Sequence, residues 1–124
     1  MIKGIGIDIV EIDRITSSIL KWGDKFLKKI FNDHEISLCY KKKNTFQCLA
    51  ARFAAKEAFI KALSDSGAEG RMPGLKDITV MNYASGKPFI FSPKDLTECY
   101  VINLTISHER HYTVAMVILE SKEI

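Results

Sequence analysis

The 124-residue sequence has no long apolar run and only three cysteines. A membrane-spanning helix needs about 20 consecutive apolar residues, so we expect no membrane association. The N-terminal segment has neither the charged start nor the apolar core of a secretory signal peptide. Cys39, Cys48 and Cys99 are odd in number and have no CxxC spacing. This pattern argues against disulfides and against a structural metal site, and it favours a reducing, cytoplasmic environment.

The composition is that of an ordinary globular protein, but the charge is unevenly distributed. Hydrophobic residues make up 47% and charged residues 27% of the chain, and the length fits a single domain over residues 1–124. The formal net charge is +3, yet residues 13–62 contain eleven Lys and Arg against five Asp and Glu, which makes this part +6. Such a region indicates an acidic partner, either a protein, a nucleotide or a nucleic acid. The alternative is a solvated, lysine-rich helical face.

Hydrophobic periodicity predicts one strand, then helices, then further strands. Residues 3–12 alternate as a strand, with Ile5, Ile7 and Ile9 on one face. Predicted helices follow at 14–22 with Asp13 as N-cap, from 34 with Asn32 and Asp33 as caps, and at 44–63 behind a polar cap. Predicted strands lie at 75–83, 88–92, 101–107 and 111–119, with a loop at 65–74 and a helical turn within 92–100. The fold class is therefore α+β, with a mainly antiparallel sheet packed on a long helix.

Asp8 stands among isoleucines and valine in the segment GIGIDIVEI, residues 4–12. A buried carboxylate is costly unless it is paired with a cation or bound to a metal. The rest of the chain is therefore expected to supply a cation or a metal site. The structural alternative is a carboxylate at a strand end that accepts hydrogen bonds from backbone N–H groups.

A second carboxylate, Glu57, belongs to the apolar face of the predicted long helix. On a helical wheel it falls in the middle of a stripe formed by Phe46, Ala50, Phe53, Ile60 and Ser64. Two carboxylates on elements that pack together repel each other, and a divalent cation removes this repulsion. Oxygen ligation by two side chains is typical of Mg²⁺, which keeps several waters and also takes phosphate oxygens. The structural alternative for Glu57 is an ion pair with Lys61 or Lys56.

Basic groups and a turn indicate that the ligand is phosphorylated. Arg52, Lys56 and Lys61 are close to Glu57 in the sequence. The turn ASGKP, residues 84–88, offers backbone N–H groups and a lysine to a phosphate. Together with Mg²⁺, these groups indicate phosphoryl-type transfer, in which positioning and charge neutralisation supply most of the catalysis.

One of the three histidines is a candidate ligand contact. His108 follows a predicted strand that ends at Ser107, and it offers a hydrogen-bond donor or acceptor. His34 and His111 have the character of ordinary polar surface residues.

Three segments of this sequence resemble the signature segments of the holo-acyl-carrier-protein synthases, the small single-repeat 4′-phosphopantetheinyl transferases. They are GIGIDIVEIDRI (4–15), FAAKEAFIKAL (53–63) and ISHERHYTVAMVILE (106–120). The resemblance covers residues 2 to 121, with the segments in the same order and spacing. It implies the 4′-phosphopantetheinyl transferase fold and a trimer with each active site between neighbouring subunits. It also implies two partners, coenzyme A and acyl carrier protein.

The resemblance further implies a reaction and a metal site. The family transfers the phosphopantetheine arm of coenzyme A to a serine of apo acyl carrier protein, for fatty acid biosynthesis, and releases adenosine 3′,5′-bisphosphate. Its strand aspartate and helix glutamate, here Asp8 and Glu57, bind Mg²⁺, which also holds the pyrophosphate of coenzyme A. Glu57, or a metal-bound water that it orients, is the hypothesised base for the serine. Lys61 is expected to stabilise charge on the pyrophosphate as the bisphosphate leaves.

Other positions correspond to binding residues of the family. The residues expected to contact coenzyme A are Lys61, Arg52, Gly86, Lys87, Pro88 and His108, the last beside the adenosine 3′-phosphate. The residues expected to meet the acidic carrier protein are Arg14, Lys21 and Lys25, extended by Lys28 and Lys29. The sequence departs from the family at 64–67, where Ser-Asp-Ser-Gly replaces the usual Gly-Thr-Gly turn, so contacts of this loop with coenzyme A stay open.

Two other functions use parts of the same pattern. A Mg²⁺-dependent phosphohydrolase would employ the same carboxylates, with water in place of the serine. A non-enzymatic module that binds RNA or coenzyme A would employ the basic region. RNA stacking needs aromatic and basic residues side by side, but Phe89, Phe91 and Tyr112 have little basic charge among them. We therefore expect no nucleic-acid partner.

Overall fold

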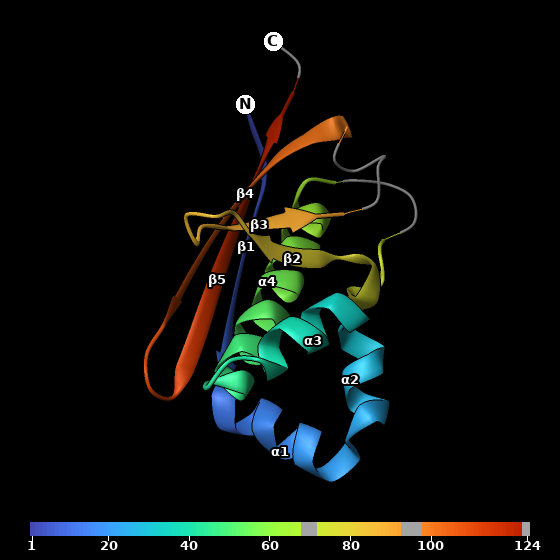
Figure 1. The fold of residues 1–124 in the computed structure, drawn as a ribbon. Helices are drawn as coiled ribbons and strands as arrows, with labels where there is room; N and C mark the ends of the chain where they lie inside the picture. Colours follow the sequence, from blue (N-terminus) through green and yellow to red (C-terminus); the bar gives the residue numbers. More distant parts are fainter. Residues whose placement is uncertain (68–71, 93–97, 123–124) are drawn as a thin grey trace.

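Two antiparallel sheets lie beside one long helix, α4 (Thr45–Asp65), in the computed structural model (Figure 1). The structure describes residues 1–67, 72–92 and 98–122. Within these residues the shorter helices are α1 (Ile12–Trp22), α2 (Asp24–Ile30) and α3 (Asp33–Tyr40), and a 3₁₀ turn spans Leu75–Asp77. The strands are β1 (Ile2–Glu11), β2 (Thr79–Asn82), β3 (Pro88–Phe91), β4 (Tyr100–His108) and β5 (Tyr112–Ser121).

The larger sheet has the strand order β1-β5-β4, and the smaller sheet is the β2–β3 hairpin. Every neighbouring pair is antiparallel. Figure 1 shows α4 running along the larger sheet, with α1 to α3 gathered on the other side of this helix. The predicted α+β class, antiparallel sheet and long helix are confirmed. Among the described residues, no helix is long and apolar enough to cross a membrane.

Two glycines let β1 lie directly on α4. A Cβ atom at Gly4 would lie 2.2 Å from the carbonyl oxygen of Ala62, and one at Gly6 would lie 2.0 Å from that of Ala58. Ala58 and Ala62 are one helical turn apart, so small side chains on the helix face the glycines. A larger residue at either glycine would force the strand away from the helix. This close contact brings Asp8, two residues further along the same face of β1, next to the side chains of α4.

The predicted alternation of β1 is confirmed, and its isoleucines face away from α4. Ile5, Ile7 and Ile9 are 48%, 53% and 66% exposed. On the inner face of the neighbouring strand β5, Val117 and Leu119 are fully buried. The larger sheet therefore has one face in the core and one open face rich in isoleucine.

The N-terminal ends of the helices differ in part from the predicted ones. Asn32 caps α3 as predicted, and it forms a reciprocal capping box with Glu35. α1 begins one residue before Asp13, which lies in the first turn and is not the N-cap. Asn44 occupies the N-cap position of α4, but its side chain makes no capping bond. The helical turn predicted within 92–100 falls largely outside the described residues.

α4 is covered on more sides than its amphipathic pattern predicts. The predicted stripe around Glu57 is mostly half-buried, and Ser64 at its end is exposed. The fully buried residues of the second half of the helix are Ala54, Ala55, Lys56, Ala58, Phe59, Ala62 and Leu63. The amphipathic pattern does not predict which side chains are most buried, because β1 and β5 cover one side of the helix while α1, α3 and β2 cover other sides.

A buried ion pair joins α4 to α3. Lys56 and Glu35 are fully buried, and the Nζ atom of Lys56 lies 2.5 Å from Oε1 of Glu35. Nζ also donates to the carbonyl oxygens of Ile30 (2.8 Å) and Leu75 (3.0 Å). Burial lowers the pKa of Lys56, and the charge of Glu35 opposes this effect. The predicted alternative of an ion pair between Glu57 and Lys56 is wrong, because adjacent helical residues point about 100° apart.

Cys39 and Cys48 form a disulfide, contrary to the prediction from cysteine number and spacing. Cys39 lies near the end of α3 and Cys48 near the start of α4, and their Cα atoms are 5.5 Å apart. The short connection between the helices turns the chain back on itself and brings the two thiols together. Cys99 is free and exposed.

Candidate active site

Asp8 is paired with a lysine of α4. Its Oδ1 atom lies 3.0 Å from Nζ of Lys61, and the Asp8 side chain is 16% exposed. Nζ of Lys61 also donates to the carbonyl oxygen of Ile7, at 3.1 Å. Lys61 itself is 55% exposed, so the pair lies at the rim of the site. The chain therefore supplies Asp8 with a cation, as the sequence predicted, and this cation is an ammonium group.

Glu57 faces the same hollow as Asp8. Both carboxylates line a surface hollow of about 490 Å³. Burial raises the pKa of Glu57, the charge of Asp8 raises it further, and Lys61 partly offsets both effects. The two acids are thus close enough to repel each other, as predicted from their elements. A raised pKa also makes Glu57 a stronger base than an ordinary glutamate near neutral pH.

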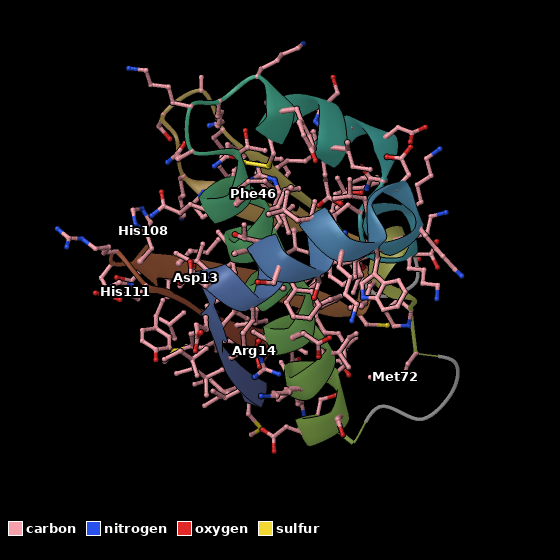
Figure 2. The ribbon with its side chains drawn as sticks, turned by 90° about the horizontal axis from the view of Figure 1, so that it is seen from below. Asp13, Arg14, Phe46, Met72, His108 and His111 are labelled. Atoms are coloured by element: carbon pink, nitrogen blue, oxygen red, sulfur yellow. A yellow bond between two sulfur atoms is a disulfide. The ribbon has the colours of Figure 1, made fainter. Side chains whose placement is uncertain are left out.

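Arg14 of α1 also lines the hollow that holds the two carboxylates. Figure 2 shows Arg14 beside β1 and α4, where the hollow lies. Sequence reasoning missed Ile15, Ser18 and Phe53, which line the same hollow. A helical signal existed for two of these residues, because Ser18 is one turn after Arg14 and Phe53 is one turn before Glu57.

The 84–88 turn is held to α4 by two hydrogen bonds in series. Nη2 of Arg52 donates to Oδ1 of Asn82 at 2.9 Å, and Nδ2 of Asn82 donates to the carbonyl oxygen of Gly86 at 2.9 Å. Gly86 has φ +93°, a conformation that favours glycine. Lys87 is exposed next to it, and Pro88 begins β3. Sequence reasoning identified the turn but missed Asn82.

Arg52 is almost fully buried, with 6% of its surface exposed. Its Nη1 atom donates to the carbonyl oxygen of Cys48 at 3.5 Å and lies 3.2 Å from the sulfur of the same residue. Its Nε atom has no hydrogen-bond partner among the described residues. Desolvation lowers the pKa of Arg52, and the charge of Glu35 partly offsets this effect. The hydrogen-bond partners of this buried cation, Cys48 and Asn82, are uncharged, and the opposing charge that acts on it is that of Glu35.

His108, at the end of β4, is exposed and bonded to α4. Its Nδ1 atom lies 2.9 Å from Nε2 of Gln47. Figure 2 shows His108 near Phe46 at the start of α4, with His111 further along the β4–β5 hairpin. Sequence reasoning missed Gln47, because a neutral polar residue in the first turn of a helix carries no distinctive signal.

The predicted carrier-binding lysines gather on α1 and α2 around the exposed ring of Trp22 and the half-buried ring of Phe26. Lys25 and Lys29 line a second hollow of about 360 Å³ together with Trp22 and Phe26. Nζ of Lys21 lies 5.0 Å from the centre of the Trp22 ring, a cation–π contact. Phe26 also lines the carboxylate hollow. The basic surface and the carboxylate site are therefore contiguous.

The donor chemistry of the carboxylate pair fits a hard divalent cation. Asp8 and Glu57 offer oxygen atoms, and the described residues contain no cluster of three or more His, Cys, Asp or Glu side chains suited to a metal. Two carboxylates leave most of the coordination sphere to water and to ligand oxygens, which suits Mg²⁺ with a phosphate ligand.

A family model for the 4′-phosphopantetheinyl transferase superfamily matches residues 4–117. The chain belongs to the 4′-phosphopantetheinyl transferase superfamily. A member named holo-[acyl-carrier-protein] synthase, from Halothermothrix orenii, is 44% identical to it over an alignment of 126 positions. The alignment covers 97% of this chain and 98% of the relative.

Solved structures of this superfamily have the same fold. The holo-(acyl-carrier-protein) synthase of Bacillus anthracis, in complex with CoA (3′,5′-ADP), matches with a TM-score of 0.81 and 37% identity over 98% of this chain and 99% of that chain. The Helicobacter pylori holo-[acyl-carrier-protein] synthase, in complex with coenzyme A, matches with a TM-score of 0.78 and 32% identity over 94% of this chain and 99% of that chain. The antiparallel sheet and long helix predicted from the sequence are thus those of a phosphopantetheinyl transferase.

Proposed function

We propose that this chain transfers the 4′-phosphopantetheine moiety of coenzyme A to a serine of apo acyl carrier protein. The products are holo carrier protein, for fatty acid biosynthesis, and adenosine 3′,5′-bisphosphate. The observation that carries this proposal is that Asp8 of β1 and Glu57 of α4 line one hollow, with Lys61 at its rim. Near-full-length similarity to a protein named holo-[acyl-carrier-protein] synthase supports the same activity. We treat residues 1–124 as one transferase domain.

Asp8 and Glu57 are the proposed ligands of Mg²⁺, which when bound would supply positive charge at the phosphoryl centre. Glu57, or a metal-bound water that it orients, is the proposed acceptor of the proton of the attacking serine hydroxyl. Lys61 holds Asp8 in the metal-free protein and donates to phosphate oxygens as negative charge moves onto the departing bisphosphate.

We assign the nucleotide end of coenzyme A to the 84–88 turn and to the end of β4. Gly86, Lys87 and Pro88 lie along the nucleotide, and His108 meets the adenosine 3′-phosphate. The exposure of Gly86, Lys87 and His108 supports this assignment. Arg52 acts from behind the turn, where it holds Asn82 against the carbonyl oxygen of Gly86, and its buried charge favours a phosphate at the turn.

Acyl carrier protein is the proposed partner of the basic surface on α1 and α2. Arg14, Lys21 and Lys25 attract an acidic protein and orient it on approach. Trp22, which is 55% exposed, offers an apolar contact within this surface. Since Arg14 lines the carboxylate hollow, a carrier bound here would bring its serine to the site.

We also propose that the working form is a homotrimer in the cytoplasm. The exposed isoleucines of β1 support assembly, since Ile5, Ile7 and Ile9 form one apolar row on an open sheet face. The proposed substrates, coenzyme A and an acyl carrier protein, support the location.

Intact-mass spectrometry tests the proposed reaction directly. An apo acyl carrier protein is incubated with this protein, coenzyme A and Mg²⁺, and the expected result is a mass gain of one phosphopantetheine arm. The gain should disappear with EDTA and with the Asp8→Ala variant. No gain with carriers from several sources would contradict the proposal. Release of the bisphosphate without any carrier would instead identify a phosphohydrolase.

A further inference from the structure

A short chain of hydrogen bonds fixes the side chain of His108 against the first turn of α4. Nδ2 of Asn44 donates to Oε1 of Gln47 at 2.6 Å. The nitrogen of the same amide, Nε2 of Gln47, lies 2.9 Å from Nδ1 of His108. An amide N–H group can only donate, so Nδ1 of His108 is the acceptor.

An acceptor at Nδ1 determines where the imidazole proton is. In a neutral imidazole one nitrogen accepts and the other carries the hydrogen. His108 therefore carries its hydrogen on Nε2. The two ring nitrogens point in divergent directions, so Nε2–H is directed away from the amide of Gln47. His108 is exposed, and its donor is thus free to reach a ligand at the surface near the start of α4 (Figure 2).

We propose that Gln47 is a positioning residue that holds His108 as the Nε2–H tautomer and so presents a hydrogen-bond donor to a phosphate. This inference rests on the proposed function, in which the phosphate is the 3′-phosphate of coenzyme A. The opposite tautomer in the same orientation would turn a lone pair toward the phosphate oxygens and lose the bond. A neutral amide suits this role, because a carboxylate at position 47 would place a negative charge close to the phosphate.

Nitrogen NMR of the metal-free protein tests the tautomer without any ligand. The protein is labelled with ¹⁵N-histidine, measured at about pH 9, well above the ordinary pKa of histidine, and His34 and His111 serve as internal references. We expect His108 to be a single Nε2–H tautomer in the wild type and a mixture in Gln47→Met, which keeps the chain length but lacks the donor. The neighbouring Thr45→Ala change is the matched control and should leave the signal unchanged. A dominant Nδ1–H tautomer in the wild type, or no change in Gln47→Met, would overturn the proposal.

Steady-state kinetics tests whether this orientation serves a phosphate. The KM is measured for coenzyme A and for 3′-dephospho-coenzyme A, which lacks that phosphate. Gln47→Met is expected to raise the KM for coenzyme A roughly three- to tenfold, with a smaller effect on kcat. Its KM for 3′-dephospho-coenzyme A should not change, and Thr45→Ala should change neither value. Equal effects on both substrates, or none, would overturn the role in phosphate binding.

If the proposed transferase function is wrong, binding measurements distinguish that failure from a failure of the positioning role of Gln47. If no transfer occurs, calorimetric binding of adenosine 3′,5′-bisphosphate and adenosine 5′-monophosphate replaces the two KM values. Binding of neither nucleotide would overturn the ligand assignment, while the NMR result still decides the tautomer. A preference for the bisphosphate that Gln47→Met leaves intact would overturn the positioning role alone.

Discussion

The two carboxylates of the site differ in what balances their charge. Asp8 has the ammonium group of Lys61 at 3.0 Å. Glu57 has a pKa raised first by burial and then by Asp8, and Lys61 offsets this only in part. Lys61 and Arg14 thus stand against three acids, Asp8, Glu11 and Glu57, and the metal-free site is short of positive charge. The deficit is removed when a cation binds or when Glu57 takes up a proton, so both metal and pH should report on it.

Replacing Glu57 with glutamine should separate activity from stability. We expect turnover to fall about 100-fold or more, because an amide cannot accept the serine proton. The metal-free variant should be more stable than the wild type at about pH 8, because ionising a carboxyl whose folded-state pKa is raised destabilises the fold. As the pH falls through this pKa, the wild type binds a proton and the difference in unfolding free energy should shrink.

Urea denaturation at several values from about pH 8 to about pH 5, in the presence of EDTA, measures this difference. Glu120→Gln, a neutralising change on β5, is the control and should not reproduce the pattern. A stability difference that grows toward acid pH would contradict the raised pKa of Glu57.

The proposed metal site sets Lys61 and the cation in competition for Asp8, so replacing Lys61 should strengthen metal binding. In Lys61→Met without coenzyme A, we expect the affinity for Mn²⁺, measured by electron paramagnetic resonance, to rise about tenfold. A unit charge about 4 Å away is worth about 1 kcal/mol even in water, and this repulsion disappears in the variant. Transfer should nevertheless fall, because Lys61 is proposed to contact the phosphates. Lys41→Met is the surface control, and weaker Mn²⁺ binding in Lys61→Met would show that Lys61 does not compete with the metal.

At the scale of elements, β1 and α4 show which structural features a local sequence pattern predicts and which it does not. The alternation of residues 3–12 and the glycine-free run 44–63 predicted a strand and a helix, and both are confirmed because local periodicity governs them. Asp8 and Glu57 were selected as candidate site residues because a charge within an apolar pattern stands out. The packing of β1 on α4 was predicted, but its closeness was not, because the fit of glycine against alanine is visible only once the elements are in contact.

The features that sequence reasoning missed depend on partners from different elements. The disulfide joins residues nine apart through a turn whose path the sequence does not reveal. The pair between Lys56 and Glu35 joins residues 21 apart, and neither side chain differs in type from many surface residues. Gln47 and Asn82 are neutral polar residues, and the roles assigned to them here follow only from what they contact.

Gly6→Ala should be costly for a change of one methyl group. The added Cβ atom would lie 2.0 Å from the carbonyl oxygen of Ala58 and 2.6 Å from the backbone nitrogen of Ala62. These are helix backbone atoms that cannot rotate away, so β1 must move off α4. We expect a loss of about 2–3 kcal/mol in unfolding free energy, measured by urea denaturation. The exposed Lys3→Ala change on the same strand should stay within about 0.5 kcal/mol of the wild type, and the same small loss in Gly6→Ala would contradict the close contact.

At the scale of the whole molecule, one face of the larger sheet is covered by a helix and the other face is exposed. α4 covers the inner face. On the outer face, the exposed isoleucines of β1 pair across to further apolar residues of β5, in the register Ile5 with Ile118, Ile7 with Met116 and Ile9 with Val114. Scattered apolar residues are normal on a surface, but a continuous row over two strands is typical of an interface. Further copies of the same chain are the covering that the trimer proposal supplies.

A charge within this row should therefore dissociate the assembly without unfolding the subunit. We expect the wild type to sediment as a trimer and Ile7→Glu to sediment as a monomer with an unchanged circular dichroism spectrum, because assembly would bury the new carboxylate without a partner. Leu20→Glu is the matched control, since Leu20 is 74% exposed on α1, away from the sheet, and this variant should stay trimeric. Transfer should fall with the trimer, because Asp8 lies on the same strand as the interface row. A monomeric wild type, or a trimeric Ile7→Glu, would mean that this face is not where the copies meet.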